Sequence, residues 1–73
     1  MDFRDIVRGK NVAYQWYEQQ AIARQRAMTS RGVVPDDIAR RYAEGRRIYH
    51  LWLVELARHQ AERVRSVEQE LDR

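Results

Sequence analysis

Large apolar side chains recur every three or four residues in two stretches of the chain, which is the spacing of one face of an α-helix. In the second stretch they form one stripe that is interrupted only by Gln60. Its members are Ile38, Tyr42, Tyr49, Leu53, Leu56, Val64, Val67 and Leu71. No stretch shows the strict alternation that is typical of a strand. The pattern predicts an all-α protein with a long helix over residues 35–72.

The first stretch has less clear boundaries. Its stripe consists of Phe3, Val7, Tyr14, Tyr17, Ala21 and Met28. The tripeptide Gly9-Lys10-Asn11 falls within it, and glycine weakens a helix while asparagine can cap a new one. Two readings remain: a single helix over about 2–30, or a short helix over 2–8 followed by a helix over 12–30. We favour the second.

A turn over residues 31–35 separates the two stretches. Gly32 can adopt the left-handed conformation that ends a helix, and Pro35 suits the first turn of the next one. Such a short connection joins antiparallel neighbours. Residues 1–73 are therefore expected to form a single antiparallel helical hairpin. Matching positions across the turn places Tyr14, Trp16 and Tyr17 opposite Tyr49 and Trp52, so we expect an aromatic cluster at its centre.

The length of the second helix bears on whether the hairpin is complete. A helix of about 36 residues is ~54 Å long, whereas a compact domain of 73 residues has a radius of gyration near 11 Å, according to the size scaling of folded chains. The hairpin must therefore be elongated, and two helices leave most of their sides uncovered. We expect oligomerisation or docking on a partner to complete it.

Apolar residues also occur outside the main stripes. Leu51 and Val54 lie on the face opposite the stripe of the second helix, and Ile48 and Trp52 lie between the two faces. The first helix has a second face of its own: Val12, Trp16, Ala23 and Ala27. We therefore predict a partner interface formed by Trp16, Ile48, Leu51, Trp52 and Val54. The alternative is that a bent N-terminal helix covers these residues within one monomer.

Charge distinguishes one end of the predicted hairpin. The chain carries 14 basic and 11 acidic residues, for a net charge of +3, and thirteen of the basic residues are arginine. Residues 24–47, around the turn, carry a net +4. Arg40, Arg41, Arg46 and Arg47 are candidate contacts for phosphate or for an acidic partner, so nucleic-acid binding is the alternative function. These four arginines spread around the helix and do not share one face.

The sequence offers little for catalysis. The chain lacks cysteine, a glycine-rich phosphate loop and a nucleophile-elbow sequence. His50 and His59 are nine residues apart, on opposite sides of a helix. Glu55, His59 and Glu62 share a face, which we interpret as a solvated polar face with His59 paired to Glu55. We expect no metal, no cofactor and no enzymatic activity.

Localisation and role are inferred from the same features. The longest run of large apolar residues, at 51–54, is far too short to cross a bilayer. The N-terminus lacks a signal-peptide pattern, and acidic residues on the second helix argue against binding to anionic lipid. We expect a cytoplasmic location, or one within a particle assembled there. The expected role is a small structural or regulatory subunit, such as a minor component of a virion or another large complex.

Overall fold

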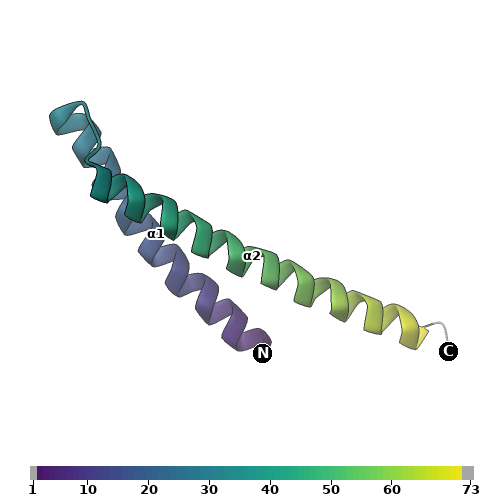
Figure 1. Cartoon of the computed structure of the whole chain (residues 1–73). Helices are drawn as coiled ribbons and strands as arrows, with labels where there is room; N and C mark the ends of the chain where they lie inside the picture. Colours follow the sequence, from purple (N-terminus) through teal and green to yellow (C-terminus); the bar gives the residue numbers. More distant parts are fainter. Residues whose placement is uncertain (1, 72–73) are drawn as a thin grey trace.

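Two long helices joined by a short turn make up the protein. The computed structural model describes residues 2–71, which form α1 (Phe3–Arg31) and α2 (Asp36–Leu71). The helices run antiparallel (Figure 1), because Phe3 stacks on His59 near one end and Tyr17 contacts Tyr42 near the turn. The all-α helical hairpin predicted from the sequence is thereby confirmed. The predicted end of the second helix at residue 72 lies outside the described residues.

The first helix is unbroken, so the predicted division into helices over 2–8 and 12–30 is wrong. α1 runs through Gly9, Lys10 and Asn11 without interruption. A Cβ atom at Gly9 would overlap the six-membered ring of the Trp52 indole from α2. Gly9 therefore provides space for a side chain of the other helix. Glycine disfavours a helix by roughly 1 kcal/mol relative to alanine, and at this position it allows the close approach of the Trp52 side chain.

Backbone geometry at the turn explains where each helix stops and starts. Gly32 has φ 73°, in the left-handed region, and its N–H donates to the carbonyl oxygen of Met28 at 3.0 Å. The carbonyl oxygen of Pro35 accepts from the N–H of Ala39 at 3.0 Å. Pro35 therefore lies just before the helix, and α2 begins one residue later than predicted.

A narrow seam of buried residues, among them two alanines and one glycine, lies where the two helices meet. The buried residues of α1 recur every seven positions: Ile6, Ala13, Gln20 and Ala27. Gly45 is the buried residue of α2. Its missing Cβ allows the Tyr17 Cα atom of α1 to approach within 3.3 Å of the position a Cβ would occupy. The core predicted from the sequence consists of larger residues on either side and does not include this seam.

The hairpin is long and thin. Its extents are 63 × 17 × 15 Å and its radius of gyration is 17.6 Å, well above the ~11 Å of a compact chain of this size. α2 also continues past the start of α1 (Figure 1), since Arg63 already lies over the ring of Phe3, the first residue of α1. We call residues 64–71 the C-terminal overhang. All of them are exposed.

Candidate functional site

The large side chains of the hairpin divide into two sets, one on each side of the seam. We call the first set the tyrosine flank: Tyr14, Tyr17, Tyr42, Tyr49 and Leu53. We call the second set the tryptophan flank: Val12, Trp16, Ile48 and Trp52. An open groove runs along each flank, and the two grooves share no lining residue. The predicted aromatic cluster is thus split, with the tyrosines on one side and the tryptophans on the other.

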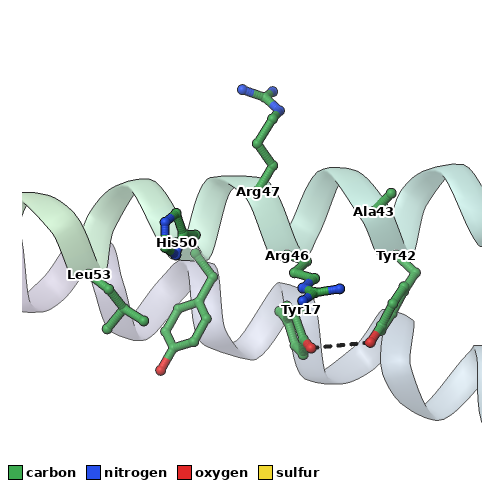
Figure 2. Close-up of a pocket in the computed structure, with 8 residues that line it drawn as sticks. Tyr17, Tyr42, Ala43, Arg46, Arg47, His50 and Leu53 are labelled. Carbon is green, nitrogen blue, oxygen red and sulfur yellow. Dashed lines mark hydrogen bonds between the residues drawn. The ribbon is translucent and has the colours of Figure 1, made fainter.

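Aromatic contacts between the helices hold the tyrosine flank together. Tyr49 packs against Tyr14 and Tyr17, with ring centroids 5.4 and 5.7 Å apart. The hydroxyl groups of Tyr17 and Tyr42 lie 3.3 Å apart and share a hydrogen bond (Figure 2). The guanidinium of Arg24 lies over the Tyr42 ring, 5.1 Å from its centroid. These contacts leave an open groove of about 720 Å³ between the two helices.

The hydrogen bond between Tyr17 and Tyr42 has an electrostatic consequence. It raises the pKa of Tyr17 above its ordinary value of 10.0, and partial desolvation and charge repulsion from an ionised Tyr42 add to the increase. Arg46 and Arg24 act in the opposite direction. The phenol therefore stays protonated at neutral pH, and the groove presents hydroxyl groups together with arginines.

On the tryptophan flank, each tryptophan packs on a glycine of the opposite helix. The indole of Trp52 covers Gly9, and the indole of Trp16 approaches within 3.1 Å of where a Gly45 Cβ would lie. The groove on this side measures about 660 Å³ and has Asp5, Arg8 and Glu44 at its edges. Despite these contacts, Trp16 keeps 43% of its surface exposed.

The structure brings together part of the predicted partner interface. Trp16, Ile48 and Trp52 line the groove of the tryptophan flank. Leu51 and Val54 do not line it; they lie farther around α2 and are 54% and 44% exposed. Within residues 2–71, α1 does not fold back over these two side chains, contrary to the alternative of a bent N-terminal helix.

The four candidate arginines are all exposed. Arg46 and Arg47 both line the tyrosine groove; Arg46 lies beside Tyr17, whereas the side chain of Arg47 extends outward from α2 (Figure 2). Among the described residues, the single ion pair joins Arg58 to Glu55 at 3.7 Å. Arg40, Arg41, Arg46 and Arg47 are therefore not neutralised by ion pairs within the described hairpin.

The histidine and hydroxyl side chains form no catalytic arrangement in the described part of the chain. His59 stacks on Phe3 at 5.4 Å, and Glu55 pairs with Arg58, so the expected pairing of His59 with Glu55 is not formed. No group of three or more His, Asp or Glu side chains that could hold a metal is present in residues 2–71. The hydroxyls of Thr29, Ser30 and Ser66 each donate to a carbonyl oxygen four residues earlier.

Three apolar side chains of the predicted stripe are exposed and uncovered: Val64, Val67 and Leu71. The sequence predicts them at the end of the core, but they belong to the overhang, where α1 no longer runs beside α2. The difference in helix lengths indicates this overhang, because α2 has 36 residues and α1 has 29. A hairpin with such unequal arms must leave the end of the longer arm uncovered.

Comparison with models of protein families, with curated proteins and with solved structures finds no match to this chain. Neither α1 nor α2, over the described residues, has the length of apolar sequence needed to cross a membrane. The class that the structure defines is an all-α helical hairpin.

Proposed function

We propose that the protein is a non-enzymatic helical subunit, structural or regulatory, that acts by binding other protein chains along the sides of its two helices. The supporting observation is the imbalance between buried and exposed apolar groups. Among the described residues, the buried apolar side chains are Ile6, Ala13 and Ala27, while twelve large apolar side chains remain exposed. Since apolar burial is the main force that stabilises folded proteins, we expect this hairpin to gain much of its stability from a partner that covers the exposed set.

Surface area supports the same proposal. The accessible surface is 6183 Å², about 1,400 Å² more than the ~4,800 Å² that a compact monomer of 8.8 kDa exposes. Tryptophan, tyrosine and arginine, the residue types enriched in binding hot spots, lie along both grooves. A chain that binds others through such surfaces fits a role as a subunit or adaptor in a larger complex.

Stability at low concentration tests this proposal. Helicity should decrease on serial dilution of the purified chain, and the melting temperature should fall with it, because folding and association are coupled. Circular dichroism melts over a dilution series measure both. A melting temperature that does not change on dilution, together with a cooperative transition of the monomer, would contradict the proposal.

Nucleic-acid binding is the second candidate function. It is supported by the unneutralised arginines near the turn, where residues 24–47 carry a net +4. Replacing Arg40, Arg41, Arg46 and Arg47 with glutamine should abolish a mobility shift on DNA or RNA, and the wild-type shift should weaken with added salt. If the wild-type protein gives no shift at low salt, this candidate is excluded.

A further inference from the structure

The apolar surface of the overhang continues one flank of the hairpin and not the other. Residues eighteen apart in an α-helix lie on the same face, because eighteen residues make about five turns. Leu53 and Tyr49, of the tyrosine flank, are followed eighteen residues later by Leu71 and Val67. The tryptophan flank has no such continuation. Ile48 and Trp52 are followed eighteen residues later by two polar residues, Ser66 and Glu70.

This continuity has a consequence for what covers the tyrosine flank. Beyond Arg63 no residue of α1 lies beside α2, so α1 cannot cover Val64, Val67 and Leu71. The apolar stripe extends along the whole of α2, well past the region that α1 can reach (Figure 1). A partner that covers it must therefore be about as long as α2.

Resting on the function proposed above, we propose that the tyrosine flank binds a second copy of this chain in antiparallel orientation. In this arrangement the overhang of each copy lies along the tyrosine groove of the other, near its turn. The middle of α2, marked on the tyrosine flank by Leu53, lies next to the twofold axis. The two hairpins together form an elongated four-helix bundle, with helix packing of the kind found in other bundles.

The surplus surface fits a second copy in amount. Two chains together expose roughly 2,800 Å² more than compact monomers of their mass would. Obligate homodimers bury roughly 2,000–5,000 Å² in total. The uncovered surface of the hairpin is therefore of the size that a permanent dimer buries.

Charge determines the orientation. Residues 24–47, at the turn end, carry a net +4, whereas the overhang carries Glu68 and Glu70 against Arg65, a net −1, and the last turn of α2 contains no basic residue. The negative pole of the helix dipole lies at the same end. Antiparallel copies place each acidic end beside an arginine-rich end, whereas parallel copies would bring the two arginine-rich ends together.

Disulfide trapping tests both the surface and the orientation, because the natural chain contains no cysteine. The contacts of Trp52 with Gly9 and of Trp16 with Gly45 fix the register of α1 against α2. In an antiparallel dimer centred on the middle of α2, Val67 of one copy lies at the same height as Arg40 in α2 of the other copy. Within that other copy, the register between the helices places Ala21 of α1 at the height of Arg40. Ala21 follows Tyr14 by seven residues, so it lies on the tyrosine flank.

The experiment mixes chains carrying Ala21→Cys with chains carrying Val67→Cys under mild oxidation. A matched control mixes Ala23→Cys with Ser66→Cys, which lie at the same level of the hairpin but on the tryptophan side. We expect disulfide-linked dimers from the first mixture, far fewer from either of its variants alone, and none above background from the control.

Three results would overturn the proposal. Val67→Cys chains that link readily to each other indicate parallel copies. Cross-linking of the control pair indicates dimerisation through the tryptophan flank, and no cross-linking in either mixture indicates that neither flank binds a second copy. The first two results leave the proposed function intact, whereas a stable monomer in the dilution series contradicts that function itself.

Tryptophan fluorescence gives a second, independent measurement. Trp16 and Trp52 are the two tryptophans of the chain, and both lie on the tryptophan flank. We therefore expect both indoles of the folded dimer to remain accessible to a water-soluble fluorescence quencher, since Trp16 keeps 43% of its surface exposed in the hairpin. Near-complete protection of both indoles in the dimer would show that the tryptophan flank is buried by the second copy, and would contradict the proposal.

Discussion

Gly9 illustrates how the role of a residue in one helix depends on the neighbouring helix. In sequence it resembles a helix breaker, and in the structure it provides the space that the Trp52 indole occupies. The reciprocal contact of Trp16 with Gly45 has the same form. Neither contact could be predicted from the sequence, because the propensity of glycine depends on its own helix while these contacts depend on the register between two helices.

Gly9→Ala tests this role. In an exposed helix the substitution stabilises by about 0.5–1 kcal/mol, but here the new methyl group displaces the Trp52 indole. We expect a net destabilisation of about 1–2 kcal/mol, the cost typical of overpacking reduced by the gain in propensity. Thermal melts followed by circular dichroism measure it.

The control is the same substitution in a Trp52→Ala background. With the indole removed, Gly9→Ala should become stabilising, and the double-mutant cycle then gives the coupling between the two positions. If Gly9→Ala stabilises the wild-type hairpin as well, the described contact with Trp52 is wrong.

Tyr17 provides a pH-dependent test of the tyrosine flank. Because the hydrogen bond to Tyr42 raises the pKa of Tyr17, the folded chain holds this proton more tightly than the unfolded chain. This contribution to stability is fully present below pH 10 and is lost as the pH rises through the higher pKa of the folded state.

Absorbance titration of the phenol groups measures this pKa. We expect the wild-type protein to show a phenol that titrates above the ordinary tyrosine pKa of 10.0, and Tyr42→Phe should remove this late step because it removes the hydrogen bond. Tyr14→Phe serves as the control, since the hydrogen bond joins Tyr17 to Tyr42. A late-titrating tyrosine that persists in Tyr42→Phe would contradict the assignment.

At the scale of the elements, the turn and the type of secondary structure were predictable, whereas the core was not. Gly32 and Pro35 mark the turn through backbone geometry alone, which depends on local sequence. The core depends on which residues let two helices approach closely. Ala13 and Gln20 carry no hydrophobic signal, yet they lie in the seam, and the larger tyrosines are displaced to the flank.

Gly32→Ala tests the end of α1. Gly32 has φ 73° and no neighbouring atom within 4 Å of where a Cβ would lie, so the only cost is that of the left-handed backbone. We expect a destabilisation of about 1 kcal/mol, measured by thermal melts. Gly32→Asn should be milder, because asparagine tolerates this conformation. Equal stability of all three proteins would contradict the described helix cap.

At the scale of the whole molecule, the elongated shape followed directly from the predicted helix length, and the 63 Å extent confirms it. The overhang at the end of α2 also follows from the helix lengths, because α2 is longer than α1. Which of the apolar faces binds a partner could not be read from the sequence. The stripe predicted as core turned out to extend along one flank, with Leu53, Val64 and Val67 exposed.

Substitutions in the overhang test association through residues that make no contact between α1 and α2. Val64→Glu with Val67→Glu should abolish dimer formation, because both side chains lie on the surface that is proposed to bind the second copy. These residues lie outside the paired part of the hairpin, so neither substitution removes a contact between α1 and α2. Ser66→Glu with Gln69→Glu adds the same charge to the opposite side and should leave the dimer intact. Sedimentation velocity distinguishes the two outcomes.

The predicted interface that includes Leu51 and Val54 is tested in the same way. Replacing both with glutamine should leave the antiparallel dimer intact, because they lie outside the tyrosine flank. The same double variant should weaken any complex with a different protein that docks on this side of α2. Loss of the homodimer in this variant would place the self-association surface on the face around Leu51 and Val54.

The solution mass tests most directly the central claim that the hairpin requires another chain to complete its core. Light scattering behind a sizing column should give 17.6 kDa, twice the chain mass of 8.8 kDa. On dilution, the mass and the helicity should fall together. A stably helical monomer of 8.8 kDa whose melting temperature is independent of concentration would contradict the account.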